Sequence, residues 1–179
     1  MSLIMIIGPM FAGKTNELIK RINTSTSRKL IINNILDTRY SNSNIASHDG
    51  KLYPCINLEK LKHIYPIIKN NDYDEIYIDE VQFFDDLYEV VWDLVVNKFK
   101  HVIISGLDGD YQIHPFNKSH MLDLIPLANE ILKLHSKCYK CNKNAWFTKK
   151  ISQLKCSEQI LIGNDNIYQP TCLEHHLGI

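Results

Sequence analysis

The chain begins with an apolar run that breaks into glycine and proline and ends in Gly-Lys-Thr. Residues 3–15 read LIMIIGPMFAGKT, which contains the pattern G-x-x-x-x-G-K-[ST] from Gly8 to Thr15. The apolar run predicts a strand and the residues after it predict a helix, which is the context this pattern requires. Backbone N–H groups in such a turn point inward and, with the positive end of the following helix, surround phosphate oxygens. We therefore expect a nucleoside triphosphate site.

Each residue of this phosphate loop is a candidate contact to ATP. We expect Lys14 to reach the β- and γ-phosphates and Thr15 to offer its hydroxyl to Mg²⁺. The other expected contacts are Gly8, Pro9, Met10, Phe11, Ala12 and Gly13. The alternative is a glycine-rich turn before an ordinary helix, which the strand and helix flanks of the motif disfavour.

Downstream of the phosphate loop, apolar patterns alternate between strand and helix. Residues 29–36, 75–79 and 101–105 predict strands, and residues 16–23, 58–70 and 85–98 have helical spacing. We expect Pro66 to bend or end the second of these helices. Residues 121–134 predict a short helix and a strand, and residues 37–50 predict a long loop. Strands alternating with helices after a phosphate loop indicate an α/β fold with a parallel sheet.

Composition narrows the classes of function. The chain has 179 residues and a formal net charge of zero. This balance argues against binding to nucleic acid or an anionic membrane, which requires a basic excess. The sequence has no apolar stretch of membrane-spanning length and enters its first strand directly, so we expect a cytoplasmic protein without a signal peptide. Its five cysteines are then expected to be thiols or metal ligands rather than disulfides.

Two carboxylates follow the strand predicted for residues 75–79. A phosphate loop needs an acid across the site to hold the Mg²⁺ shell, and Asp79 stands at the end of an apolar strand, where that acid is normally found. Glu80 is placed to accept the proton of a substrate hydroxyl as the phosphoryl group arrives. In a simple ATPase, Glu80 would activate water instead. The remaining alternative is two solvated acids at a strand end.

The last part of the chain contains two pairs of metal-ligand residues at equal spacing. Cys138 and Cys141 form a C-x-x-C pair, and Cys172 and His175 form the second pair. Such pairs, separated by a segment that can form a hairpin, are typical of a structural zinc ribbon. His176 competes with His175 as the fourth ligand. Because the composition changes near residue 135, we expect a phosphate-loop domain over residues 1–134 and a zinc-binding domain over residues 135–179.

Several segments together resemble one family over nearly the whole chain. They are GPMFAGKT at 8–15, DTRYSNS at 37–43, SHDG at 47–50, DEVQFF at 79–84, GLDGDYQIHPF at 106–116 and IGNDNIYQPTC at 162–172. In this order, with a late zinc ribbon, they resemble the type II thymidine kinases. The resemblance implies a RecA-like P-loop fold with a zinc-ribbon domain whose lasso loop covers the substrate. It also implies transfer of the γ-phosphate of ATP to thymidine or deoxyuridine, a homotetramer and feedback binding of dTTP.

The resemblance also assigns roles to residues. Glu80 matches the general base that takes the proton of the 5′-hydroxyl, and Asp79 matches the Walker B acid. Thr148 matches a position near the methyl group of the base, and Tyr168 a contact on the sugar side. Other matched positions line the base or belong to the lasso: Met10, Phe83, Tyr111, Phe116, Ile160, Leu161, Ile162 and Gly163. The role of Asp37 and Arg39 near the phosphates is left open. The sequence departs from the family in having Asp110-Tyr111 and a histidine as fourth zinc ligand.

One independent observation favours a neutral acceptor. Kinases that act on nucleoside monophosphates grip a second phosphate, a task suited to several bidentate arginines, and this chain has only Arg21, Arg28 and Arg39. The predicted aromatic contacts have an alternative in plain core packing, above all Phe84 and Phe116. Two other functions remain open: an ATPase or switch, and a zinc-ribbon module that binds single-stranded nucleic acid. The breadth of nucleoside specificity is not fixed by the sequence.

Overall fold

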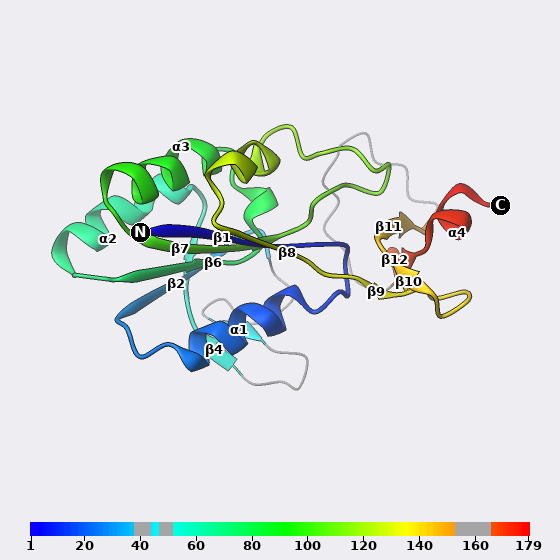
Figure 1. Cartoon of the computed structure of the whole chain (residues 1–179), viewed down its shortest axis with the longest axis horizontal. Coiled ribbons are helices and arrows are strands. Elements are labelled where there is room, and N and C mark those ends of the chain that lie inside the picture. The colour runs from blue at the N-terminus through cyan, green and yellow to red at the C-terminus, as the bar shows by residue number, and fades with distance from the viewer. Residues whose placement is uncertain (38–43, 47–51, 153–165) are drawn as a thin grey trace.

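A parallel six-stranded sheet forms the centre of the molecule. The computed structural model describes residues 1–37, 44–46, 52–152 and 166–179. The sheet strands are β1 (Ser2–Ile7), β2 (Lys29–Asn34), β5 (Ile56–Leu58), β6 (Glu75–Ile78), β7 (His101–Gly106) and β8 (Glu130–Lys133). Their order across the sheet is β5-β2-β6-β7-β1-β8, and all the pairings are parallel (Figure 1). The predicted α/β fold is confirmed.

Side-chain alternation along the strands builds a core on each face of the sheet. In β1, Leu3, Met5 and Ile7 join one apolar cluster, whereas Ile4 and Ile6 join the other. The first cluster is covered by α2 (Ile64–Asn70), α3 (Leu87–Trp92) and the 3₁₀ helix η4 (Met121–Leu127). The second is covered by α1 (Lys14–Thr24), on the opposite side of the sheet (Figure 1). Helices on both faces are what an all-parallel sheet requires, because neither face can meet water.

Helix α1 confirms the helix expected after the phosphate loop. Leu18, Ile19 and Ile22 are buried, as their spacing predicts. The helix begins after Gly13, whose left-handed backbone turns the chain into it. Arg21 on its last turn binds the carboxylate of Glu130 in β8 at 2.5 Å, which ties the helix to the edge of the sheet.

The predicted helix over residues 58–70 is wrong at its start. Leu58 ends strand β5, a 3₁₀ turn η1 follows at Leu61–His63, and α2 begins only at Ile64. Pro66 therefore lies in the first turn of α2, where a backbone N–H has no partner within the helix, and it neither bends nor ends the helix. The helix predicted for residues 85–98 is α3 continued by the π-helix η3 (Asp93–Asn97), and its apolar face is buried as expected.

The loop predicted for residues 37–50 is also corrected. Strand β3 (Asn44–Ala46) lies within it and pairs antiparallel with β4 (Leu52–Pro54). Ile45 is 2% exposed and packs into the cluster beneath α1. One buried isoleucine among polar neighbours gives too little periodicity to predict a strand. Arg39 lies outside the described residues.

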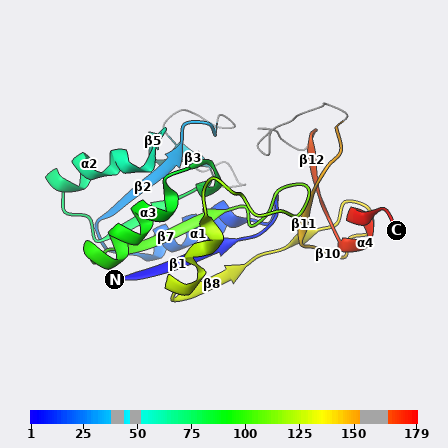
Figure 2. The same ribbon diagram turned by 90° about the horizontal axis from the view of Figure 1, so that it is seen from above.

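The C-terminal segment lies beyond the carboxyl ends of the sheet strands (Figure 2). It consists of two antiparallel pairs, β9 (Ser136–Lys137) with β10 (Asn144–Ala145) and β11 (Phe147–Lys150) with β12 (Tyr168–Thr171), followed by α4 (Leu173–Leu177). Ligands of open parallel sheets bind at this edge. Within the described ranges, the helices are all too short or too polar to cross a bilayer.

Candidate nucleotide and zinc sites

Gly8 lets the phosphate loop pass close to the end of β8. Its φ is +147°, and a Cβ built on it would lie 2.4 Å from the backbone oxygen of Leu134. Both the backbone conformation and the space therefore require glycine at this position. The loop then runs over Phe11, which also has a positive φ of 63°, to Gly13 at the start of α1. The path from β1 to α1 is the strand–loop–helix arrangement predicted for the phosphate-binding motif.

Lys14 and Thr15 both make hydrogen bonds within the candidate site. The buried ammonium of Lys14 donates to the backbone oxygen of Pro9, with an Nζ–O distance of 2.8 Å. The hydroxyl of Thr15 donates to Oδ2 of Asp79 at 2.8 Å. The second contact joins the phosphate loop to the end of β6, so the structure brings together the motif and the acid that the sequence predicted to lie opposite it.

Asp79 and Glu80 form a buried acidic pair. They are 2% and 7% exposed. Burial and the neighbouring charge of Glu80 raise the pKa of Asp79 to about 6, although the hydrogen bonds that Asp79 accepts act in the other direction. Glu80 has a φ of 50° in the left-handed region, which costs a residue other than glycine about 1–3 kcal/mol. Backbone strain of this kind is concentrated at functional sites.

Gln82 is a polar residue of this site that sequence reasoning missed. Its side chain is 1% exposed and contacts two groups. Nε2 donates to Oε2 of Glu80 at 2.5 Å, and Oε1 accepts from the backbone N–H of Leu107 at 3.0 Å. An amide two residues after an acidic pair has no spacing signal of its own. Only the 3₁₀ turn η2 (Val81–Phe83) brings it back to the carboxylate.

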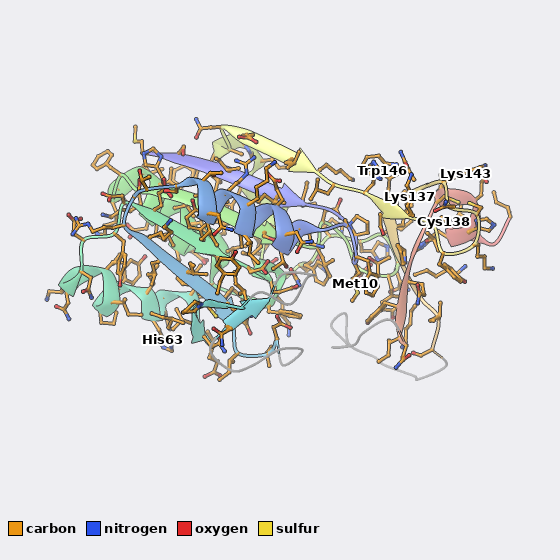
Figure 3. All side chains as sticks on the ribbon, turned by 90° about the horizontal axis from the view of Figure 1, so that it is seen from below. Met10, His63, Lys137, Cys138, Lys143 and Trp146 are labelled. Atoms are coloured by element: carbon orange, nitrogen blue, oxygen red, sulfur yellow. The ribbon has the colours of Figure 1, made fainter. Side chains whose placement is uncertain are left out.

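The C-terminal segment contacts the phosphate loop directly. The backbone N–H of Met10 donates to Oγ1 of Thr148 in β11 at 3.0 Å. Met10 lies between the sheet and the part of the segment that carries Cys138 (Figure 3). A second contact is made by Lys150, whose Nζ lies 5.6 Å from the ring centroid of Tyr111. Thr148, Met10 and Tyr111, to which the family resemblance assigns substrate contacts, thus belong to one junction between the two parts of the chain.

The other predicted substrate contacts are less closely defined by the structure. Phe116 and Tyr168 are 9% and 6% exposed, and Phe83 is partly buried. Such burial suits core packing as well as contact with a flat base. Their substrate role therefore stays a prediction. Ile160, Leu161, Ile162 and Gly163 lie outside the described residues.

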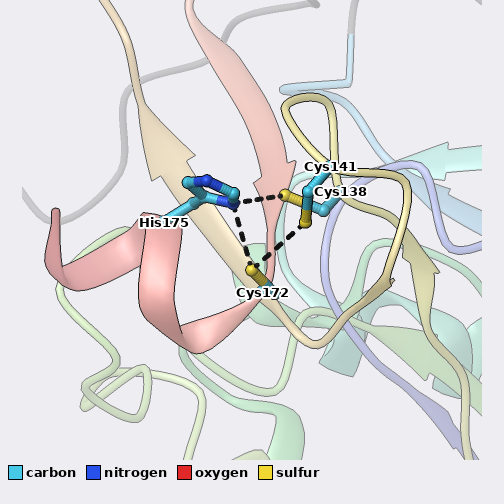
Figure 4. A group of neighbouring side chains, drawn as sticks. All are labelled: Cys138, Cys141, Cys172 and His175. Atoms are coloured by element: carbon cyan, nitrogen blue, oxygen red, sulfur yellow. Dashed lines mark hydrogen bonds between the residues drawn. The ribbon is translucent and has the colours of Figure 1, made fainter. Parts of the chain in front are cut away.

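The side chains of the four predicted zinc ligands converge on one another in the C-terminal segment (Figure 4). The ligand atoms of Cys138, Cys141, Cys172 and His175 all lie within 4.8 Å of one another. The Cys141 and Cys172 sulfurs are 3.7 Å apart, and Nδ1 of His175 lies 3.4 Å from the Cys138 sulfur and 3.2 Å from that of Cys172. A tetrahedral zinc ion has ligand separations of about 3.8 Å between sulfurs and about 3.6 Å between sulfur and nitrogen. The arrangement is consistent with a zinc site.

The surroundings of this cluster favour His175 over His176 as the fourth ligand and stabilise helix α4. Nδ1 of His176 lies 3.3 Å from the hydroxyl of Thr171, outside the cluster. Lys149 donates to the backbone oxygens of both histidines at 2.8 Å and so places a cation at the end of α4, where it is favourable. Burial opposes ionisation of Cys138, but backbone hydrogen bonds lower its pKa to about 6 and favour the thiolate that binds metal.

Taken together, these features define a phosphate-loop α/β protein with an acidic pair opposite the loop and a C-terminal Cys₃His cluster that is consistent with a zinc site. A model of the family described as "Thymidine kinase" matches residues 1–176. The chain therefore belongs to the thymidine kinase family, as the resemblance of its motifs predicted.

Individual relatives support this assignment. The thymidine kinase of Oryza sativa subsp. japonica is 37% identical over 97% of this chain, which spans 65% of that relative. The thymidine kinase of Mycoplasma mobile is 39% identical over 97% of the chain and 86% of its own length. That of Amsacta moorei entomopoxvirus is 39% identical over 96% of each protein. Since these relatives are named as kinases, the family is one of phosphotransferases.

Proposed function

We propose that this protein is an ATP-dependent thymidine kinase with an in-line mechanism. The 5′-oxygen of thymidine forms a bond to the γ-phosphorus of ATP, the bond from that phosphorus to the β,γ-bridging oxygen breaks, and the 5′-hydroxyl proton passes to Glu80. The products are thymidine 5′-monophosphate and ADP. The observation that carries this proposal is the buried pair Asp79 and Glu80, joined to the phosphate loop by the 2.8 Å bond from Thr15.

The phosphate loop is proposed to bind the triphosphate of ATP. Its backbone N–H groups and Lys14 compensate the phosphate charge. In the structure Lys14 donates to Pro9, so nucleotide binding exchanges a carbonyl partner for phosphate oxygens. The oxygens of Thr15 and Asp79 are the hard donors that Mg²⁺ prefers. When bound there, Mg²⁺ compensates charge on the β- and γ-phosphates.

Glu80 is proposed as the base because of its chemistry and position. It is a carboxylate next to the acid that contacts the phosphate loop, and its strained backbone is held by a 3₁₀ turn. A carboxylate within hydrogen-bond reach of a hydroxyl can take its proton as the phosphorus–oxygen bond forms. In an ATPase the same group would direct water, so the acceptor distinguishes the two activities.

Thymidine, and by the same geometry deoxyuridine, is proposed to bind where the C-terminal segment meets the phosphate loop. Met10, Thr148 and Tyr111 belong to that junction. We propose that Phe83, Phe116 and Tyr168 supply flat apolar surface for the base, and that residues 160–163 contribute to the same site. The family gives this proposal its substrate, since its members are named thymidine kinases.

The remaining proposals concern assembly and environment. We propose that residues 135–179 act as a zinc-binding domain whose metal supports the fold, since four protein ligands leave no open coordination position. Cys55 and the three proposed zinc-ligand cysteines form no disulfide in the described part of the chain, from which we propose a reducing compartment such as the cytoplasm. A homotetramer and feedback binding of dTTP are proposed from the family resemblance.

A nucleoside panel tests this function. The protein is incubated with labelled ATP and thymidine, deoxyuridine, deoxycytidine or no nucleoside, and monophosphate and ADP are both measured. We expect monophosphate from thymidine and deoxyuridine, with ADP formed in equal amount. ADP formed at the same rate without a nucleoside would instead indicate an ATPase.

The base assignment needs a separate variant. Glu80→Gln should lower kcat by about 10²- to 10⁴-fold, the usual contribution of a general base. Binding of ATP, measured by its protection against thermal unfolding, should persist because the phosphate loop is unchanged. A variant with nearly full turnover would show that another group accepts the proton.

A further inference from the structure

We propose that Gln82 is a positioning residue, which orients the carboxylate of Glu80 for proton transfer. This inference rests on the proposed function, in which Glu80 is the base. It is carried by the pair of hydrogen bonds through which the Gln82 amide bridges Glu80 and the backbone at the end of β7. Gln82 is too deeply buried, at 1% exposed, to be a surface contact of the substrate.

The chemistry of the two partners fixes which way the amide points. The backbone N–H of Leu107 can only donate, so the atom 3.0 Å from it must be the carbonyl oxygen Oε1. The amino group Nε2 is then left to face Glu80, where it donates to Oε2 at 2.5 Å. In the reverse orientation, the amino group of Gln82 would face the N–H of Leu107, which is also a donor, and its carbonyl oxygen would face the carboxylate of Glu80, which is also an acceptor. A buried amide held in this way has one orientation.

The position of Gln82 is also fixed sterically. A Cβ added to Gly106 would lie 2.8 Å from Oε1 of Gln82 and 2.7 Å from Cγ2 of Val81, so the side chain packs against the backbone of β7. On the other side, the backbone N–H of Phe83 donates to the backbone oxygen of Glu80 at 3.2 Å and closes the 3₁₀ turn. The Gln82 amide is therefore fixed against the end of the sheet, and its hydrogen bond restricts the position of the Glu80 carboxylate.

This contact determines which oxygen of Glu80 takes the proton. Because Nε2 can only donate, it holds Oε2 as an acceptor, and the carbonyl oxygen of a protonated carboxyl group accepts more strongly than its hydroxyl oxygen. The transferred proton is therefore favoured on Oε1, and the direction of Oε1 is set once Oε2 is held. Proton transfer is sensitive to such geometry, since a misplacement of about 1 Å can cost about 10²-fold in rate.

Two variants separate the donor from the acceptor of Gln82. Gln82→Glu keeps the shape and the oxygen that accepts from Leu107 but replaces the donor facing Glu80 by a second carboxylate oxygen. Gln82→Met removes both hydrogen bonds and leaves the N–H of Leu107 without this acceptor. Gln112→Glu makes the same chemical change on an exposed side chain and serves as the control.

We expect kcat of Gln82→Glu to fall by about 10- to 100-fold. KM for ATP should stay within about twofold, because the phosphate loop is not altered. Gln82→Met should lose a similar factor in kcat and also unfold at a lower temperature, whereas Gln112→Glu should match the parent protein. Loss of thermal stability in Gln82→Glu and Gln82→Met with kcat preserved would overturn the proposal.

A double-variant cycle shows whether Gln82 acts through Glu80. If it does, Gln82→Glu should cost less than about threefold in kcat when Glu80 is already glutamine, because no base is left to orient. Equal losses in both backgrounds would mean that Gln82 acts independently of Glu80 and would overturn the inference. Full activity of Glu80→Gln alone would instead remove Glu80 as the base, the part of the proposed function on which this inference rests, so the two failures are distinguishable.

Discussion

Replacing Asp79 by asparagine should stabilise the nucleotide-free protein while abolishing its activity. The carboxylate is almost fully buried, and burial together with Glu80 raises its pKa to about 6 from an ordinary 3.8. At about 1.4 kcal/mol per pKa unit, keeping this charge costs about 3 kcal/mol of folding free energy above pH 6. Asparagine has the same shape and can still accept from the N–H of Glu80 and bond to the hydroxyl of Thr15.

The sign of the pH dependence follows from the raised pKa. Between about pH 4 and pH 6 the folded protein retains a proton that the unfolded chain has released, so the native protein loses stability as the pH rises through this window. The gain from Asp79→Asn should therefore be largest near pH 8. At about pH 5, between the two pKa values, it should be about half as large.

Thermal unfolding without Mg²⁺ or nucleotide measures this gain. For a chain of this size, about 3 kcal/mol corresponds to a rise in Tm of about 6 to 12 °C at pH 8. Comparing the two proteins at each pH cancels the titration of groups that they share. A lower Tm for the variant at pH 8, or an equal gain at pH 5 and pH 8, would refute the argument that a buried charge is being removed.

Three further perturbations test other parts of the site. Gly8→Ala should lower Tm and abolish ATP protection in thermal melts, because its Cβ would lie 2.4 Å from the backbone oxygen of Leu134; unchanged ATP protection would contradict this. Thr148→Val should lower the free energy of unfolding in urea by about 1–3 kcal/mol and raise KM for ATP, since it leaves the N–H of Met10 without this acceptor. Thr148→Ser keeps the hydroxyl and should retain the stability and the KM of the parent protein. Metal analysis should find about one zinc per chain. Cys172→Ser should lose that zinc and unfold earlier, and full zinc content in this variant would exclude the proposed ligand set.

Several strands and helices of the central sheet could be predicted because they carry their own periodicity. The strand before Gly8, the helix after Thr15 and the buried face of α3 all follow from local patterns. The start of α2 could not be predicted from periodicity, because Leu58 continues the helical spacing although it pairs in the sheet as the end of β5. There a tertiary contact overrode the local pattern.

The site was predictable where chemistry fixes sequence spacing. The two ligand pairs of the zinc cluster and the Gly-Lys-Thr turn are such cases. Neither the Gln82 contact nor the contact of Met10 with Thr148 could be predicted from spacing. The first depends on how a turn folds back, and the second joins residues 138 positions apart in the chain. Glu80 was predicted from the need for a group that accepts the proton of a substrate hydroxyl, but its strained backbone could be seen only in the structure.

The pairing of β11 with β12 has a consequence for which changes of sequence and length this part of the protein can accept during evolution. Lys150 lies opposite Tyr168, and the backbone N–H of Ile151 donates to the backbone oxygen of Ile167 at 2.8 Å. The chain therefore leaves β11 and enters β12, the two stems of the hairpin, at neighbouring positions. At the other end of the hairpin, Cys172 of the Cys₃His cluster directly follows β12, and Lys149 of β11 donates to the backbone oxygen of His175. Doubling the number of residues between the stems would add only about 0.6 kcal/mol of closure entropy. Insertions or exchanges between the stems can therefore be accommodated while the acidic pair and the Cys₃His cluster keep their places.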